Sequence, residues 1–162
     1  MGFDCASFPR REGRTRGGEA LGVGADLVGK TIARAFERSD TASGAIRWWY
    51  AKSGSMLAQS GYRLGCPVAT VALETAHTSE ALTTALASAV HRWLDLLAVG
   101  LRAKGVPASD ADDLALVCLV QIEGALLVAR VLGDTKPVDA AADLVAALLD
   151  AAAGPTNDVL PA

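Results

Sequence analysis

The feature of this sequence that most constrains its fold is a repeat of apolar residues between Ser79 and Gly105. Apolar side chains recur there every three or four residues, which places them along one face of an α-helix. They are Leu82, Leu86, Ala89, Val90, Trp93, Leu97 and Leu101. Ser79 is a typical residue before a helix, and Gly105 followed by Pro107 is a typical helix end. The segment therefore predicts a long helix that must bury one face against other elements.

The same spacing predicts helices through most of the chain. We expect them over residues 19–38, 41–60, 67–75, 80–104, 109–132 and 135–153. Residue types that commonly cap helices stand at three of these starts, namely Thr41 or Ser43, Ser109 or Asp110, and Thr135. Residues 68–73 could instead form a strand. Hydrophobic residues make up 51% of the 162 residues but aromatic residues only 5%, so alanine, leucine and valine dominate, and the first two are strong helix formers. We predict one all-α domain of about six helices over residues 19–153, between an irregular basic tail (1–18) and a flexible C-terminal tail (154–162).

The overall charge and the cysteine content exclude several classes of protein. The formal net charge of −3 gives no basic surface for coating a phosphate backbone. Cys5, Cys66 and Cys118 are far apart and lack metal-ligand spacing, so we expect free thiols, no metal and no cofactor. The N-terminus has no signal-peptide pattern, and the apolar run over residues 114–122 is too short to span a bilayer. These features predict a soluble protein of the cytoplasm.

Cys66 directly precedes Pro67 at a predicted helix start. The dipole of a helix can lower the pKa of a thiol at its N-terminus, which would make Cys66 reactive toward oxidants or alkylating agents. The alternative is a cysteine that the fold merely tolerates. The sequence is compatible with either interpretation.

Gly24–Thr31 reads GADLVGKT and matches the G-x-x-x-x-G-K-[ST] pattern of nucleotide-binding P-loops. A P-loop needs a buried strand directly before it, yet only residues 19–23 separate this segment from an arginine- and glycine-rich stretch. The helical spacing of residues 19–38 favours an amphipathic helix that contains glycines. Nucleotide binding through Lys30 and Thr31 is the alternative.

The segment over residues 110–132 is apolar on nearly every side. A helix of this kind must be central in a fold or buried against a partner. One side carries Gln121 as its single polar residue, which could orient a ligand or bond a neighbouring backbone group. The opposite side and the predicted last helix would form a dimer interface with two-fold symmetry. The residues of this predicted interface are Val120, Gly124, Leu127, Val131, Ala141, Val145, Leu148 and Ala152.

Two stretches of the chain resemble a known family. They are Gly65–Glu74 (GCPVATVALE) and Gln121–Arg130 (QIEGALLVAR), with Trp93 in the long helix between them. Together they resemble the C-terminal regulatory domain of TetR-family transcriptional repressors, in the subgroup that includes lincomycin-type drug-resistance regulators. The resemblance covers about residues 19–150.

The resemblance implies a regulator without enzymatic activity. In that family the regulatory domain binds a small, often hydrophobic effector between its helices, and the last two helices pair with those of a second copy in a four-helix bundle. Aromatic and apolar walls with few polar groups are typical of such ligand sites. The candidate ligand-binding residues are Trp48, Trp49, Tyr50, Met56, Trp93, Leu97, Cys118 and Gln121. For each of them, a place in the ordinary core is the alternative.

The sequence departs from the family pattern at its N-terminal end. Family members begin with a helix-turn-helix, followed by a junction to the regulatory domain. Phe8-Pro9 and Gly17–Leu21 resemble remnants of that junction, and the recognition helix has no counterpart. We therefore expect operator DNA to be a partner only where an intact helix-turn-helix is present. A module that only dimerises, without binding DNA, is a further alternative.

Overall fold

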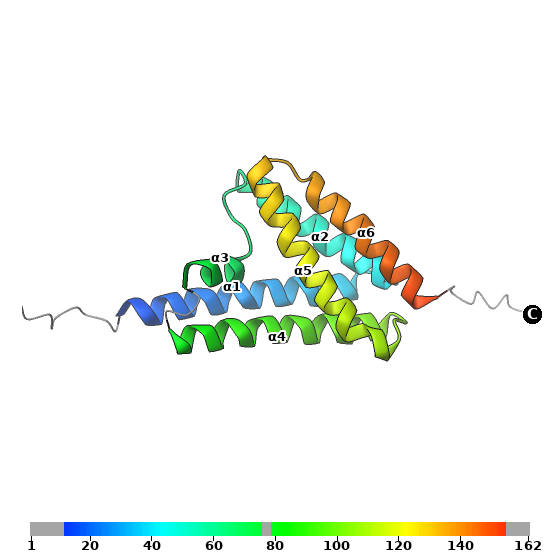
Figure 1. Cartoon of the computed structure of the whole chain (residues 1–162), viewed down its shortest axis with the longest axis horizontal. Coiled ribbons are helices and arrows are strands. Elements are labelled where there is room, and N and C mark those ends of the chain that lie inside the picture. The colour runs from blue at the N-terminus through cyan, green and yellow to red at the C-terminus, as the bar shows by residue number, and fades with distance from the viewer. Residues whose placement is uncertain (1–11, 76–78, 155–162) are drawn as a thin grey trace, which may run out of the picture.

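The computed structural model describes residues 12–75 and 79–154 (Figure 1). It contains six helices, which are α1 (Glu12–Glu37), α2 (Ala42–Gln59), α3 (Pro67–Thr75), α4 (Glu80–Ala103), α5 (Ala108–Leu132) and α6 (Lys136–Ala153). The described residues include no strand, which confirms the predicted all-α class. The alternative of a strand over residues 68–73 is wrong, because these residues belong to α3.

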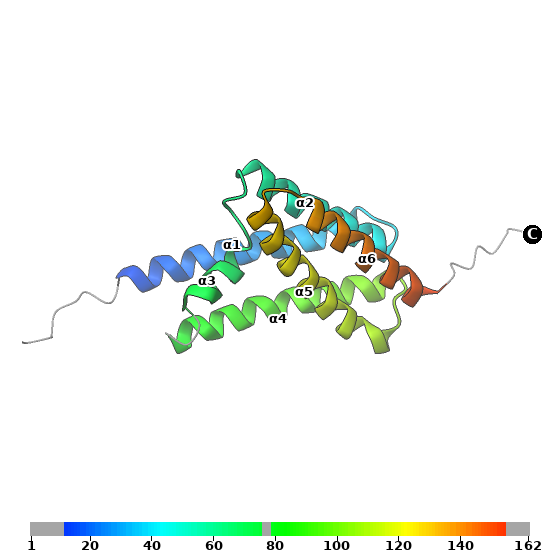
Figure 2. The same cartoon turned by 45° about the horizontal axis from the view of Figure 1, so that its top comes forward.

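The helices form two groups that pack on each other. α1 and α4 lie side by side and run in the same direction, with the short α3 beside their N-terminal ends (Figures 1 and 2). α5 rises obliquely from the C-terminal end of α4, and α6 returns antiparallel to it. α6 also packs along α2. As a result, α5 contacts α2, α4 and α6 and occupies the central position that its apolar sequence predicts.

The predicted apolar faces of α1 and α4 meet in the core. On α1 the buried residues include Leu21, Ala25, Ile32 and Phe36, and on α4 they include Leu86, Ala89, Trp93, Leu97 and Leu101. The Trp93 indole N–H donates a hydrogen bond of 2.9 Å to the carbonyl oxygen of Ala25, which joins the two helices. Gly100 permits their close approach further along, because a Cβ atom there would overlap the ring of Phe36.

Helix ends follow the predicted signals in part. The side chain of Thr41 accepts a hydrogen bond of 3.0 Å from the Gly44 N–H and so caps α2, as predicted. Gly133 ends α5 in the left-handed conformation, with φ of 64°. Thr135 is the N-cap residue of α6, as predicted, but its side chain makes no capping hydrogen bond. The carboxylate of Asp134 accepts the Lys136 N–H at 3.0 Å instead.

Two predicted boundaries differ from the structure. α5 begins at Ala108 after Pro107, so neither Ser109 nor Asp110 is its cap. α1 begins at Glu12 and not at Glu19. The glycines and arginines of residues 12–18 predicted an irregular stretch, but these residues continue the helix. Residues 1–11 and 155–162, which make up most of the two predicted tails, lie outside the described residues.

Candidate functional site

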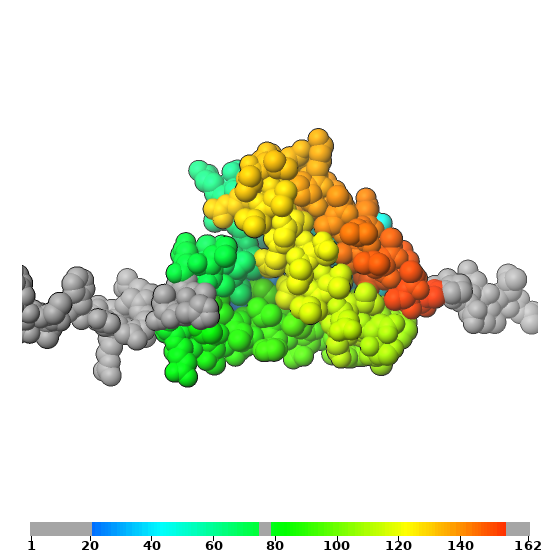
Figure 3. All heavy atoms as spheres, in the orientation of Figure 1, coloured from blue at the N-terminus to red at the C-terminus, as the bar shows by residue number. Residues whose placement is uncertain are grey.

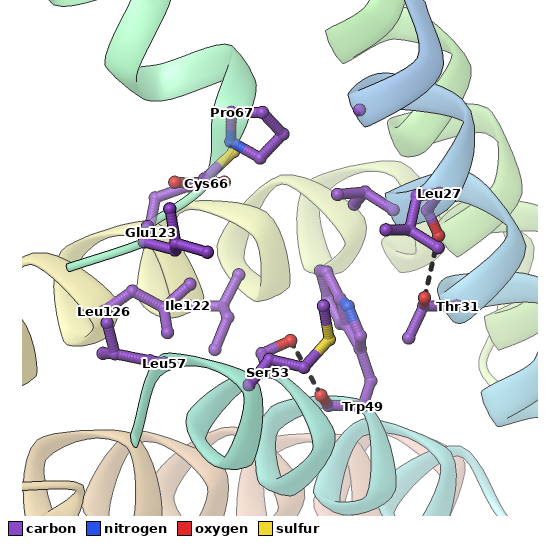
Figure 4. A pocket seen from close by; sticks show the side chains of 15 residues that line it. Leu27, Thr31, Trp49, Ser53, Leu57, Cys66, Pro67, Ile122, Glu123 and Leu126 are labelled. Atoms are coloured by element: carbon purple, nitrogen blue, oxygen red, sulfur yellow. Dashed lines mark hydrogen bonds between the residues drawn. The ribbon is translucent and has the colours of Figure 1, made fainter. Parts of the chain in front are cut away.

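A cavity of about 140 Å³ lies between α1, α2, α5 and the loop that leads into α3. Figure 4 shows Leu27 and Thr31 of α1 on one side and Cys66 and Glu123 on the other, with α2 forming the floor. The residues that line it are Gly24, Leu27, Val28, Thr31, Trp49, Ser53, Met56, Leu57, Leu64, Gly65, Cys66, Pro67, Ile122, Glu123 and Leu126. The walls are predominantly apolar, as is typical of sites for small hydrophobic ligands.

Gly24 allows α3 to close one end of this cavity. A Cβ atom at position 24 would lie only 2.9 Å from the Cβ and Cγ atoms of Pro67, which is inside ordinary contact distance. The glycine that contributes to the P-loop pattern therefore permits α1 to approach the start of α3. Gly24–Thr31 as a whole lies inside α1, so its backbone is helical and cannot form the phosphate-binding loop. The structure gives no support to the nucleotide-binding alternative.

The two hydroxyl groups that line the cavity each donate a hydrogen bond within their own helix. Thr31 donates a hydrogen bond of 2.8 Å to the Leu27 carbonyl oxygen, and Ser53 donates one of 2.9 Å to that of Trp49. Both bonds are drawn in Figure 4. Each hydroxyl oxygen can still accept a hydrogen bond from a ligand. These two side chains thus offer acceptors to the cavity while their own protons are engaged.

The strongest electrostatic feature of the cavity is the pair formed by Cys66 and Glu123. Burial raises the pKa of the Glu123 carboxyl above its ordinary value, and a hydrogen bond from the Cys66 thiol opposes this shift. Burial and the neighbouring carboxyl raise the pKa of the Cys66 thiol to about 12. The thiol is therefore protonated at neutral pH and donates to the carboxylate.

The raised pKa argues against the interpretation of Cys66 as a reactive sensor thiol. The backbone N–H groups of Val68 and Ala69 at the start of α3 do lower the pKa of the thiol, as the helix position predicts. Burial and the nearby Glu123 carboxyl outweigh them. Cys118 is also a free thiol with a pKa raised by burial to about 12, whereas Cys5 lies outside the described residues.

The structure brings two of the eight predicted ligand-binding residues to the cavity, Trp49 and Met56. Trp48 lies elsewhere on α2, where the Arg38 guanidinium stacks 5.7 Å from its ring centre. Gln121 is half-buried on α5 but does not line the cavity. The remaining four, Tyr50, Trp93, Leu97 and Cys118, are buried core residues. The Tyr50 hydroxyl, for example, donates a hydrogen bond of 2.5 Å to the Cys118 carbonyl oxygen.

Sequence reasoning missed Glu123, which is the charged group of the site. It lies two positions after Gln121 in the same apolar helix, so a charge within an apolar stretch was the available signal. It singled out Cys66 only as a thiol at a helix start and not as part of a ligand cavity, and it did not place Pro67 or α1 at that cavity. Spacing identifies which residues share a face of one helix, but it does not show which faces of three helices surround a space.

A groove adjoins the cavity on the surface between α3 and α5, where Figure 3 shows a hollow. Its volume is about 370 Å³, and it is lined by Gly65, Cys66, Ala69, Thr70, Ala72, Leu73, Glu123, Gly124, Leu126, Leu127 and Arg130. Gly65, Cys66, Glu123 and Leu126 line both the groove and the cavity. These four residues therefore form a shared wall between the interior site and the surface.

α5 leaves an apolar stripe uncovered. The predicted interface residues Val120, Leu127 and Val131 are 59%, 57% and 77% exposed, and Gly124 lies exposed between them. α5 is also the one described helix that is long and apolar enough to cross a membrane, with a mean hydropathy of 2.0 over a window of which 39% is buried. From the sequence we considered only the apolar run over residues 114–122, which is too short to span a bilayer, whereas the whole helix of 25 residues is long enough. Exposed apolar stripes of this kind are typical of interaction surfaces.

The α6 part of the predicted interface is corrected by the structure. Ala141 and Val145 are buried inside the chain, because that side of α6 packs on α2 and α5. Ala152 is half-buried, and Leu148 is exposed as predicted. Leu144 is the second exposed leucine of α6. The side of α6 that a partner could reach is therefore the one that carries Leu144 and Leu148.

Comparison with known proteins identifies relatives of this chain and a solved structure with the same fold. The chain is 32% identical over 119 residues to HTH-type transcriptional regulators of Mycobacterium tuberculosis strains CDC 1551 and H37Rv, which is 70% of this chain and 61% of each relative. It thus spans about three-fifths of the length of these curated relatives. A solved TetR transcriptional regulator from Chloroflexus aurantiacus J-10-FL shares the fold, with a TM-score of 0.64 and 23% identity over 80% of this chain and 68% of that one.

The family comparison agrees with the motifs at Gly65–Glu74 and Gln121–Arg130. Residues 42–144 match the TetR domain described as transcriptional regulator LmrA/YxaF-like, C-terminal domain. The match extends from the start of α2 into α6 and includes both motifs. The chain therefore belongs to the TetR family of transcriptional regulators and carries its LmrA/YxaF-like C-terminal domain.

Proposed function

We propose that this chain is the effector-binding and dimerising part of a transcriptional repressor, and that it senses a small hydrophobic molecule in the cavity between α1, α2 and α5. The observation that carries the proposal is the cavity itself, which is apolar apart from the polar groups of Thr31, Ser53, Cys66 and Glu123. An apolar cavity of comparable size can hold a benzene ring. A ring-sized hydrophobic group therefore fits the interior.

α1 is the element through which a ligand would act. It supplies one wall of the cavity, and in the family a DNA-binding domain precedes this helix. A ligand that fits better when α1 is displaced from α2 and α5 would favour that arrangement of the helices. In a full-length regulator, such a shift would alter the spacing of the two DNA-reading domains of a dimer. Operator DNA and a cytoplasmic location belong to this proposal, and we expect no enzymatic activity.

The proposed dimer forms through α5 and α6. The exposed stripe of α5 and the leucines Leu144 and Leu148 of α6 would meet the same surfaces of a second copy across a two-fold axis. Two helices from each copy then form a four-helix interface. This arrangement also accounts for the length and apolarity of α5, which we propose is the central helix of a soluble dimer and not a membrane span.

The cavity is tested with 4-phenylbutan-1-ol, a neutral molecule that combines an aromatic ring with a short chain. Ser53→Phe places a ring in the cavity, whereas Ser55→Phe makes the same change at an exposed position of α2. Isothermal titration calorimetry should give one binding site per chain in the wild type and in Ser55→Phe, and no binding in Ser53→Phe. Circular dichroism verifies that each variant is folded. Equal binding by both variants would show that the cavity is not the site.

The dimer is tested with Leu148→Glu against Val99→Glu. Both leave a carboxylate in place of an exposed apolar side chain, but Val99 lies on α4, away from the proposed interface. An unpaired charge inside an interface is costly, so we expect multi-angle light scattering to show a dimer for the wild type and for Val99→Glu, and a monomer for Leu148→Glu. A monomeric wild type, or a dimeric Leu148→Glu variant, would contradict the interface.

A further inference from the structure

We propose that the effector is a hydrophobic molecule that carries a positively charged amine, and that its ammonium group pairs with the Glu123 carboxylate while its apolar part fills the cavity. This inference rests on the proposed function, since it names the class of ligand for the same cavity. The first observation is that Glu123 has the only charged side chain among the described residues that line the cavity.

Among the described residues, no cationic side chain forms an ion pair with Glu123. The ion pairs among the described residues are Arg47–Asp143, Arg92–Asp26, Arg102–Asp112 and Lys136–Asp134. Arg130 lines the adjoining groove, but it lies two helical turns further along α5 and forms no ion pair with Glu123. Within residues 12–75 and 79–154, the side chain that donates to the Glu123 carboxyl group is the thiol of Cys66, which is a weak donor. A site for a cation is therefore open.

Partial burial makes this carboxylate receptive to a ligand. A charged group that leaves water without a partner destabilises the folded protein, and an opposite charge removes much of that cost. An ammonium ligand would supply the missing charge and up to three hydrogen-bond donors. A carboxylate ligand would add repulsion at the same position. The cavity thus discriminates between hydrophobic molecules by the sign of their charge.

The shape of the site orients such a ligand. Glu123 lies in the wall that the cavity shares with the surface groove, whereas Leu27 and Thr31 lie on the opposite side (Figure 4). The ammonium group would therefore sit near the surface and the apolar part between α1 and α2. The indole of Trp49 projects into the cavity, and its electron-rich face also attracts cations.

The test uses three molecules that share a phenylbutyl frame. These are 4-phenylbutylamine, which is cationic at neutral pH, 4-phenylbutan-1-ol, which is neutral, and 4-phenylbutyrate, which is anionic. Calorimetry at pH 7 on the wild type should give a Kd for the amine that is at least about tenfold lower than that of the alcohol, with the anion weakest. In Glu123→Gln the amine should lose this advantage while the alcohol keeps its affinity. Asp113→Asn, an exposed carboxylate of the same helix, is the matched control and should behave as the wild type.

Two results would overturn the inference. The first is equal affinity of the wild type for amine and alcohol, which would mean that Glu123 is protonated or not in contact with the ligand. The second is an amine preference that survives Glu123→Gln. In both cases, binding of the alcohol would leave the proposed hydrophobic site intact. If none of the three molecules binds, the inference and the proposed site both fail.

Discussion

Replacing Trp93 by Phe separates a core role from a ligand-binding role. The family resemblance implies that this tryptophan is a candidate wall of the effector site, but the structure places it in the core between α1 and α4, where it is 2% exposed. Its indole N–H donates to the carbonyl oxygen of Ala25, a bond that phenylalanine cannot form. We therefore expect Trp93→Phe to lower the stability of the fold and to leave ligand affinity unchanged.

The magnitude follows from the two interactions that are removed. The hydrogen bond contributes about 1 kcal/mol, since the Ala25 carbonyl keeps its place in the bonding of α1. The smaller ring loses buried contacts worth about 1–2 kcal/mol. The free energy of unfolding should therefore fall by about 2–3 kcal/mol. For a domain of this size, that corresponds to a decrease in Tm of about 5–10 °C.

The assay combines thermal unfolding by circular dichroism, at one fixed protein concentration, with calorimetric titration of 4-phenylbutan-1-ol. Trp49→Phe is the matched control, because it makes the same change at a tryptophan that does line the cavity. In this control, the Kd for 4-phenylbutan-1-ol should change by several-fold. The reasoning is refuted if Trp93→Phe leaves Tm within about a degree of the wild type. It is equally refuted if Trp93→Phe abolishes binding in a protein of unchanged stability.

Three further predictions follow from single residues. Because the pKa of Glu123 is raised in the fold, the wild type loses stability as the pH rises above the ordinary value of 4.5, so Glu123→Gln should have a higher Tm at pH 7.5 but not below pH 4; an equal difference at both pH values would contradict this. Gly100→Ala overlaps the Phe36 ring and should destabilise by about 2 kcal/mol, whereas Gly22→Ala, which meets no neighbour, should stabilise by up to about 1 kcal/mol in urea unfolding; the same sign for both would be inconsistent with the packing. Cys66, with a pKa of about 12, should react with iodoacetamide at pH 7.5 far more slowly than free cysteine, as peptide mass spectrometry would show, and fast labelling would argue against its burial.

The sequence was sufficient to predict that these helices exist, because each one carries its own periodicity and several carry a recognisable end signal. The stripes on α1 and α4 pack as their spacing requires, and Gly61, Gly105 and Gly133 stand in the left-handed conformation at three helix ends. Boundaries were less predictable where no strong signal exists. α5 begins after Pro107 without a side-chain cap, although Ser109 and Asp110 were the better candidates by residue type.

The candidate site was only partly predictable, because a cavity depends on how helices are arranged and not on any one of them. Trp93 and Trp49 are equally suitable residue types for a ligand site, yet one seals the core and the other faces the space. On α6, Ala141, Val145 and Leu148 are three or four residues apart and lie near one another on the helix, but the packing against α2 buries the first two and leaves the third exposed. Periodicity cannot determine where along an apolar face the protomer ends and a partner begins.

Glu123 lies where the proposed effector site meets the proposed dimer interface. Glu123 faces the cavity, while its neighbours Gly124 and Leu127 line the groove and lie on the exposed stripe of α5. If a second copy covers that stripe, it also restricts the mouth through which a ligand would enter. A ligand bound at Glu123 and a partner bound at Leu127 would then act on adjacent turns of the same helix. Coupling between two binding events is reciprocal, so an effector that weakens or strengthens the dimer must be bound more weakly or more tightly by the dimer in the same proportion. In this arrangement, α5 would be the element through which effector occupancy and dimer geometry influence each other.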